Sequence, residues 1–451
     1  MPAPVRSRPP ASAPTPPPAT PRFHSSILPG GLRILAARVP RLPEIAIRLV
    51  VHAGSGAEPA GQAGAAALAA RVMPAGAGGR SAMQMAEWLD HMGASIGSGV
   101  GYDSARFSLH SLSDTLDGAL DYLAEVILSP DFPPDEVARI RAEQIDEVRR
   151  SFDDPAELAA QALSEAIFGG HPYGRPVRGR LETLEALDSS LLRGFRDDFY
   201  GGDTSFLVAA GDLHPGEFTR RIEQRFGAWS PAPRHPVVEP FQGSAAGSGK
   251  VVMIDRPGSK QSEIRIGAVG LAHGDEDEFP VLVMNAILGG LFNSRLNLNL
   301  REDKGWTYGA RSGFSLRRAP GPFVARAAVD TPVTARAFEE MLSEIRSMVD
   351  RPPDEGELQL AKNALILSLP RQFETTSQVA AKEAERVAYG LPDDWWQSYP
   401  ERVQSVGVDE VVRVAERYLD REGLTLVAVG DVASVRDGLA GLGQLEVLPA
   451  P

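Results

Sequence analysis

The densest group of side chains that could do chemistry lies in residues 300–309, which read LREDKGWTYG. Arg301 carries a planar guanidinium that can donate to a carbonyl oxygen or an oxyanion, and Tyr308 adds a single hydroxyl donor. A turn at Gly305 could bring the two side chains to one place. A charged loop with a half-buried tyrosine has the same residues, and the segment alone does not separate these two interpretations.

The glycine-rich segment just before it, LGGLFNSRL at residues 288–296, is a turn ahead of a predicted helix. Glycine has no Cβ, so Gly289 and Gly290 could let a ligand approach the backbone closely. A turn that serves packing alone is the equal alternative.

Histidine is the first residue type to consider for a metal site or for acid–base work. A helical zinc motif needs two histidines three to five residues apart, so that both imidazoles lie on one face of the helix. No two of the eight histidines have that spacing; they are His24, His52, His91, His110, His171, His214, His235 and His273. This excludes a helical two-histidine site and leaves only a site assembled from dispersed residues.

Two other motifs are weaker. Residues 93–97, GASIG, match the G-x-S-x-G pattern around Ser95, but a nucleophile elbow needs a strand before the serine and a helix after it. Here a helix is predicted before Ser95 and a strand after it, which favours a turn at a helix end. Residues 243–251 resemble a phosphate-binding loop, but the spacing is one residue too long and Val251 replaces the required hydroxyl residue.

Composition excludes several classes of function. The chain has 451 residues, 46 Lys and Arg against 59 Asp and Glu, a net charge of −13 and no cysteine. Disulfides, thiolate zinc sites and cysteine nucleophiles are therefore absent, and a basic nucleic-acid footprint is not expected. No apolar run approaches the length of a membrane span. We expect a cytoplasmic protein whose acidic balance suits neutral or basic peptides.

The chain contains an internal duplication. SFLVAAGDL at residues 205–213 recurs as LTLVAVGDV at residues 424–432, and PPDE at residues 133–136 recurs at 352–355. Ile47-Arg48 recurs as Ile264-Arg265 in similar predicted strands. All these pairs are separated by about 220 residues, which indicates one unit used twice.

Both halves have the same order of predicted elements. Apolar patterns and capping residues predict strands at residues 44–52, 105–112, 206–210 and 263–269, and helices at residues 64–73, 81–91, 116–128, 134–150, 154–169 and 184–200. Strands and helices mix without strict alternation, so the fold class is predicted as α+β.

The domain boundaries follow shifts in composition. Residues 1–24 are predicted to be a disordered, proline-rich tail, without the apolar stretch of a secretory signal. Residues 25–229 form the first domain and residues 250–451 the second. Between them, residues 230–249 are rich in Pro, Gly and Ser and are predicted to be a linker.

The duplicated halves and the 300–309 segment resemble the pitrilysin/insulinase family of zinc peptidases, to which the mitochondrial processing peptidase belongs. The likeness spans residues 27–440, and its most specific block is LGGLFNSRLNLNLREDKGWTYGARS at residues 288–312. Other matching blocks are LPGGLRILAARVP (28–40), GSGAEPAGQAGAAALAARVM (54–73), IRAEQIDEVRRSFDDPAELA (140–159) and HPYGRPVRG (171–179). The resemblance implies two tandem α/β-sandwich-like domains that form half of a clamshell.

The family's zinc helix carries H-x-x-E-H, two ligands with a general base between them. The register of this sequence places that motif on Ala67-Leu68-Ala69-Ala70-Arg71, so Ala67, Ala70 and Arg71 replace both histidines and the glutamate. The position of the distal glutamate ligand is retained as Glu147. We expect no metal in this chain, and an ion pair of Arg71 with Glu147; a solvated helix carboxylate near Glu143 is the alternative.

In this family, some half-size members work as heterodimers in which one subunit supplies zinc and the base. The other supplies an arginine and a tyrosine that hold the substrate and polarise the scissile carbonyl. Arg301 and Tyr308 match that pair, which implies catalytic roles for them in a chamber shared with an H-x-x-E-H-bearing, zinc-containing partner. The residues expected to line the same chamber and contact the peptide are Gly289, Gly290, Phe292, Asn293 and Ser294.

The favoured hypothesis is therefore the non-catalytic, substrate-binding subunit of a heterodimeric zinc endopeptidase, inactive by itself. The second is a structural or peptide-holding pseudo-peptidase, like the core subunits that this family contributes to respiratory complexes. The third is an autonomous hydrolase that uses Ser95. Neither the natural peptide nor the identity of the partner follows from the sequence.

Overall fold

The computed structural model describes residues 20–237, 241, 249–420 and 423–451. Residues 1–19 of the predicted tail and half of the predicted linker lie outside them. His24, assigned to the tail, is instead the first residue of β1 (His24–Ile27), which pairs antiparallel with β2 (Arg33–Arg38). The predicted end of the tail therefore lies one residue inside the first sheet, because the proline-rich composition stops only just before this strand.

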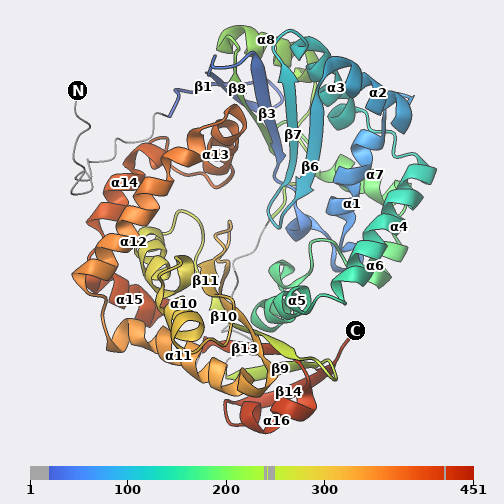
Figure 1. Cartoon of the computed structure of the whole chain (residues 1–451). Coiled ribbons are helices and arrows are strands. Elements are labelled where there is room, and N and C mark those ends of the chain that lie inside the picture. Colours follow the sequence, from blue (N-terminus) through green and yellow to red (C-terminus); the bar gives the residue numbers. More distant parts are fainter. Residues whose placement is uncertain (1–19, 238–240, 242–248, 421–422) are drawn as a thin grey trace, which may run out of the picture.

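Two six-stranded sheets form the centres of the two halves (Figure 1). The first sheet has the order β1, β2, β8 (Ser205–Gly211), β3 (Glu44–Val51), β7 (Ala105–Leu112) and β6 (Ser95–Val100). The second has the order β11 (Ala310–Phe314), β12 (Pro322–Asp330), β10 (Gln261–Val269), β13 (Thr425–Gly430), β9 (Lys250–Asp255) and β14 (Gln444–Pro449). A short hairpin adds β4 (Gly76–Ala77) and β5 (Arg80–Ser81).

The two sheets share one topology, which confirms the duplication. β2 runs parallel to β8 and β9 runs parallel to β13, whereas β3 and β10 are antiparallel to both of their neighbours. β6 and β11 occupy equivalent edges. Only the opposite edges differ, because β1 comes from the start of the chain and β14 from its end. The repeated SFLVAAG and TLVAVG segments are the equivalent buried strands β8 and β13.

Helices surround both sheets, so the fold is α+β as predicted. In the first half they are α1 (Ala65–Val72), α2 (Ala82–Met92), α3 (Leu116–Leu128), α4 (Pro134–Ser151), α5 (Pro155–Phe168), α6 (Leu181–Glu185), α7 (Ser189–Phe199) and α8 (Pro215–Phe226). In the second half they are α9 (Glu278–Asn285), α10 (Arg295–Asn297), α11 (Thr334–Asp350), α12 (Glu355–Ser368), α13 (Thr376–Ala388), α14 (Trp395–Ser405), α15 (Val408–Tyr418) and α16 (Val432–Ala440). Two short π-helical turns, η5 (Ala286–Gly290) and η6 (Leu298–Asp303), flank α10.

Local capping signals set many of these boundaries. Ser81 accepts from the Gln84 N–H in a capping box that starts α2, and Gly93 ends the helix with φ of 58°. The predicted helix at residues 184–200 is wrong in its first part. The chain breaks there into α6 and α7, because the Asp188 side chain accepts from the Ser190 and Leu191 N–H groups and starts a new helix.

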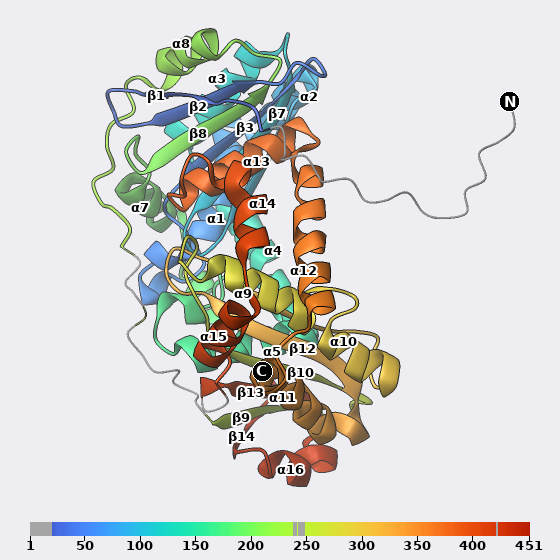
Figure 2. The same cartoon turned by 90° about the vertical axis from the view of Figure 1, so that its left-hand side faces the viewer.

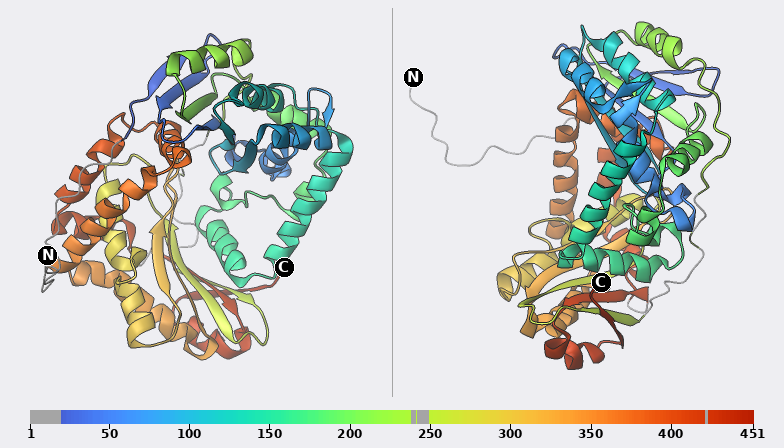
Figure 3. Two further views of the ribbon diagram at one scale, coloured as in Figure 1. Left: turned by 45° about the horizontal axis from the view of Figure 1, so that its top comes forward. Right: turned by 90° about the vertical axis from the view of Figure 1, so that its right-hand side faces the viewer.

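Each sheet is covered on one face by helices of its own half and on the other by a helix of the opposite half. α5 of the first half packs against β10 and β13, and α13 of the second half packs against β3 and β8 (Figure 1). The long helices α4 and α12 run between the two halves on opposite sides of the molecule (Figures 2 and 3). The halves are therefore joined by a reciprocal exchange of helices.

The exchanged helices bury apolar side chains on both sheets. Leu163 and Ile167 of α5 pack with Val427 and Val429 of β13. Gly267 of β10 lies under this helix, and a Cβ there would come within 2.8 Å of the Leu163 side chain. A glycine in this strand thus permits the close approach of α5.

A polar contact also joins the halves. The hydroxyl of Tyr173 donates to Asp103 at 2.5 Å, and Asp103 accepts in turn from the Arg318 N–H at 3.1 Å. The guanidinium of Arg317 lies over the rings of Tyr102 and Tyr173, 3.8 and 4.7 Å from their centroids. The loop after β11 is thereby fixed to the first half.

One helical stretch among the described residues, Glu278–Asp303, is long and apolar enough by length and composition to cross a membrane. The sequence shows no continuous apolar run there, because polar residues interrupt the apolar ones. In the fold, 67% of the most apolar 18-residue stretch of this helix is buried inside the protein.

His273 connects helix α9 with helix α13. Its Nδ1 lies 2.9 Å from Glu278 of α9, and its Nε2 lies 3.6 Å from Glu385 of α13. Burial alone would lower the pKa of His273, but the hydrogen bonds and charges of the two carboxylates outweigh it and raise the pKa to about 9. The imidazole is therefore a cation between two anions.

We predict that His273→Gln flattens the pH dependence of stability above neutrality. Because folding raises the pKa, the stabilisation is complete below pH 6.5 and is lost as the pH rises through about 9. The free energy of unfolding of the native protein should fall by about 2 kcal/mol more than that of the variant across this window. Urea denaturation at each pH measures it. His24→Gln, an exposed histidine in β1, is the control and should behave as the native protein does.

Candidate functional site

Helix α1 carries the three positions that match the zinc motif. Residues i, i+3 and i+4 share one face of a helix, so Ala67, Ala70 and Arg71 lie together. The helix packs against α4, α7 and the edge strand β6. The opposite face of α1 is buried core, so the helix keeps its place in the fold without any metal.

The start of α1 is held by a buried carboxylate. Gly64, with φ of 98°, provides no side chain to cap the helix; instead, Glu58 accepts from the N–H groups of Gly64 and Ala66 at 3.0 and 2.7 Å. Burial raises the pKa of Glu58 to about 8, against the opposite effect of these hydrogen bonds. Sequence reasoning missed Glu58, since a residue six positions ahead of the N-cap Gly64 is not a standard capping position.

Arg71 forms an ion pair with Glu147 of α4, as the sequence predicted. The two guanidinium nitrogens lie 3.1 Å from the two oxygens of Glu147, and Glu143 lies 3.5 Å away. The side chains of Arg71 and Glu147 are 30% and 35% exposed, so solvent screens the pair and its contribution to stability is small. The guanidinium lies where a bridging cation between α1 and α4 would lie.

This face does not fit zinc. Zinc in proteins is bound by imidazole nitrogens, thiolates and carboxylates, and here two alanine methyl groups and an arginine stand beside a single acidic helix. In the part of the chain that the structure describes, no group of three or more His, Cys, Asp or Glu residues could hold a metal ion.

Arg301 and Tyr308 lie in the second half, in and after η6. The guanidinium of Arg301 stacks over the ring of Phe292, 4.6 Å from its centroid, and its Nε lies 3.5 Å from Glu302. Tyr308 is 96% exposed and Phe292 is 59% exposed. Cation and ring thus hold each other on the surface, with the phenol nearby in sequence projecting into solvent.

The remaining candidates in this segment differ in exposure. Gly289 is buried, and a Cβ there would come within 2.4 Å of the backbone nitrogen of Ser312, which requires glycine. Asn293 is exposed. Ser294 is 1% exposed, so its hydroxyl faces the interior and is not available to a peptide. Ser294 is the N-cap residue of α10, but its side chain makes no capping hydrogen bond.

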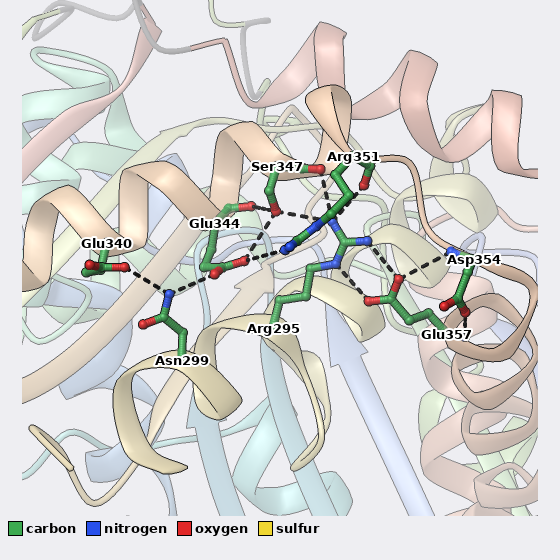
Figure 4. A network of polar contacts seen from close by, with 8 residues as sticks. All are labelled: Arg295, Asn299, Glu340, Glu344, Ser347, Arg351, Asp354 and Glu357. Carbon is green, nitrogen blue, oxygen red and sulfur yellow. Dashed lines mark hydrogen bonds and ion pairs between the residues drawn. The ribbon is translucent and has the colours of Figure 1, made fainter. Parts of the chain in front are cut away.

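A buried polar network holds this segment in place (Figure 4). Arg295 donates in a two-pronged pair to Glu357, both at 2.8 Å, and also to the carbonyl oxygens of Ser347 and Arg351 at 3.0 Å. The pair with Arg295 lowers the pKa of Glu357. Asn299 donates to Glu340 and Glu344 from the next turn (Figure 4). Arg295 therefore anchors the backbone of this segment to α11 and to the start of α12.

A cavity of about 840 Å³ lies between the halves, beside β6. β6 is an edge strand of small and polar residues, and Gly97, Ser98 and Gly99 line the cavity together with Tyr389 and Phe314 of the second half. Ser95 is exposed and lies at the start of β6, directly after α2. A nucleophile elbow has a strand before the serine and a helix after it, which is the reverse of the order around Ser95. The structure therefore agrees with the predicted turn at a helix end.

The structure thus gathers the predicted residues into two groups. Arg71 and Glu147 contact each other in the first half, and Arg301 contacts Phe292 in the second. Within the described residues, no hydrogen bond or ion pair connects one group with the other.

Two sequence models of one peptidase family match consecutive parts of the chain. The model described as "Insulinase (Peptidase family M16)" matches residues 33–180, and the model described as "Peptidase M16 inactive domain" matches residues 186–365. Together they include both α1 and the Arg301–Tyr308 segment.

Relatives and solved structures agree with this match over almost the whole chain. An uncharacterized zinc protease of Mycobacterium tuberculosis is 26% identical over 415 residues, which are 91% of this chain and 94% of that protein. A peptidase M16 inactive domain from Pseudomonas fluorescens has a TM-score of 0.84 at 25% identity, covering 91% and 98% of the two chains. A protease from Helicobacter pylori has a TM-score of 0.84 at 18% identity, covering 91% and 99%, and shares the fold.

We predict that two substitutions recreate a metal site on α1. Ala67→His with Arg71→His would place two imidazoles one turn apart, facing Glu147, which Arg71 already contacts. The double variant should bind about one zinc ion per chain, and the native protein none. Metal analysis after dialysis measures it. Adding Glu147→Gln should abolish the binding; a double variant without zinc would show that α1 and α4 do not face each other as ligand-bearing helices.

Proposed function

Since the chain belongs to the insulinase family of M16 peptidases, as an inactive-type member, we propose that it is the substrate-binding subunit of a heterodimeric zinc metalloendopeptidase that cleaves peptides. A homologous partner that carries H-x-x-E-H provides zinc and the general base. This chain contributes Arg301 and Tyr308 to the shared site.

The observation that carries the proposal is the exposure of Tyr308, at 96%. Tyrosine is usually intermediate in burial, so a ring left fully in water is accessible to a partner or a ligand. Among the described residues, no hydrogen bond involves its hydroxyl, and the guanidinium of Arg301, seven residues earlier, makes one ion pair with Glu302 at 3.5 Å and a stacking contact with Phe292. A phenol without a hydrogen bond in the described residues, and a guanidinium held only by one ion pair and one ring, keep donors available for a group outside the chain.

The chemistry fits a peptide carbonyl. As the carbonyl carbon is attacked, negative charge develops on its oxygen, and preorganised donors at that oxygen lower the barrier. Arg301 donates through a charged, planar group and Tyr308 through one hydroxyl. Phe292 limits the motion of the guanidinium by stacking at 4.6 Å. This chain positions the peptide and polarises its carbonyl group, and the partner provides the zinc and the general base for the attack on the carbonyl carbon.

The edge strand β6 supports peptide binding in the same chain. An edge strand has unpaired N–H and C=O groups, onto which an extended peptide can add as a further strand. β6 has no large side chain in the way at Gly97, Ser98 and Gly99, and it borders the cavity of about 840 Å³. A peptide paired with β6 would pass the end of α1, where the zinc motif is replaced.

We predict that activity requires the partner and then depends on Arg301 and Tyr308. The chain alone should cleave no peptide, and co-purification with an H-x-x-E-H partner should give cleavage of a fluorogenic peptide. Arg301→Ala and Tyr308→Phe should each lower kcat/KM of the complex by about 100-fold, with the zinc content of the complex unchanged.

Arg436→Ala on α16, an exposed arginine, is the matched control and should retain full activity. Full activity of both site variants would remove the proposed roles. A stable complex that never cleaves peptides, whatever its zinc content, would instead support the alternative, a structural or peptide-holding pseudo-peptidase.

A further inference from the structure

Three arginines form a row across adjacent strands of the second sheet. Arg311 of β11 pairs in register with Arg326 of β12, and Arg326 pairs with Arg265 of β10. Residues directly opposite each other in a sheet point to the same face, and like charges in that position are destabilising. An anion bound near these three neighbouring cations would therefore reduce their repulsion and stabilise the sheet.

No compensating ion pair is present for this arginine row. Within the described part of the chain, no carboxylate lies within ion-pair distance of Arg265, Arg311 or Arg326. Glu263 acts electrostatically on Arg265 and Arg326, and Asp154 acts on Arg265, but within the described residues neither forms an ion pair with them. The acids of α5, which covers this face, are used elsewhere: Glu157 pairs with Arg178 and Glu165 with Arg180.

Arg265 at the end of the row is buried. It is 5% exposed, donates from Nη2 to the carbonyl oxygen of Ala156 at 2.7 Å, and its Nε has no partner in the described residues. Burial lowers the pKa of Arg265. A buried charged donor without an acceptor is costly, so the position is stabilised when an anion supplies one.

All three arginines of the row line one cavity of about 480 Å³. Arg317 lines it as well, and its buried Nη1 also has no partner in the part of the chain described. The opposite wall is formed by Leu163, Ser164 and Ile167 of α5, and one end is formed by Gly289 and Gly290, which were predicted to contact substrate.

From these contacts we propose that the arginine row binds the carboxylate side chains of an acidic peptide segment. This inference rests on the proposed function and specifies the substrate class of the same chamber. The charge of −13 on the whole chain suits neutral or basic peptides, whereas the basic lining of this cavity favours acidic ones.

A peptide fits better than a small anion because the basic wall continues. Phe314 lines both this cavity and the larger one beside β6, so the two adjoin. The larger cavity is lined by Arg48, Arg106 and His273, together with the carboxylate of Glu385, which lies near His273. The buried Nε of Arg48 is again without a partner among the described residues. Arg48 of β3 and Arg265 of β10 are equivalent positions of the duplicated unit, so each half contributes one such arginine.

The test is binding of a fluorescein-labelled, glutamate-rich peptide to the full chain, measured by anisotropy against the same peptide with glutamine in place of glutamate. The glutamate peptide should bind at least about tenfold more tightly, with an affinity that falls as salt is added. The double variant Arg311→Ala/Arg326→Ala should lose that preference. Both side chains are exposed, so the variant should fold, which circular dichroism checks.

The matched control is Arg346→Ala, an exposed arginine on α11 that lines neither cavity; it should bind as the native chain does. Equal affinity for both peptides, or an unchanged preference in the double variant, would overturn the proposal. Displacement of the peptide by inorganic phosphate at a similar molar concentration would also overturn it, since the site would then be one for small oxyanions.

Failure of this inference differs from failure of the proposed function. If the complex with the partner cleaves neutral peptides and the double variant changes nothing, the function stands and the arginine row has no part in it. If the glutamate peptide binds through the row but no complex cleaves it, the binding stands and the peptidase role fails.

Discussion

The closing of each sheet by a helix from the opposite half is the constraint on which the molecule depends. A sheet with one apolar face uncovered would expose a continuous row of side chains to water, and each fully buried one contributes on the order of 2 kcal/mol. α5 and α13 cover these faces reciprocally. The halves consequently hold a fixed relation to each other, and the cavities between them are lined by both.

The position of α1 does not depend on zinc ligands, so the fold persists without them. α1 is held by the buried side of the helix and by Glu58 at its start, and neither depends on a metal. Replacement of ligands by alanine and arginine therefore leaves the packing intact, and Arg71 takes over the contact between α1 and α4. The second half keeps its Arg301 segment through the separate anchor of Arg295 on Glu357.

Local signals in the sequence predicted the elements well, because they act over a few residues. The capping box at Ser81, the Asp154 cap of α5 and the repeated buried strands all have short-range causes. The error at Asp188 was local too: its capping carboxylate outweighed the helical pattern on both sides.

Long-range features could not be predicted in this way. The arginine row needs the register of three strands, and Arg311, Arg326 and Arg265 show no spacing that indicates it. The Arg71 pair was predicted only because a family resemblance placed Glu147 opposite it. The net charge of the whole chain gives no information about where charges gather, so it could not indicate that Arg265, Arg311 and Arg326 line one cavity.

The helix exchange also has a consequence for the order of events on the ribosome. The first sheet is complete once Gly211 has been synthesised, but α13, which covers its second face, ends only at Ala388. At roughly 5–20 residues per second, Ala46, Val50 and Phe206 stay uncovered for many seconds of translation. During this time the second face of the first sheet is an exposed apolar surface, to which a holding chaperone can bind.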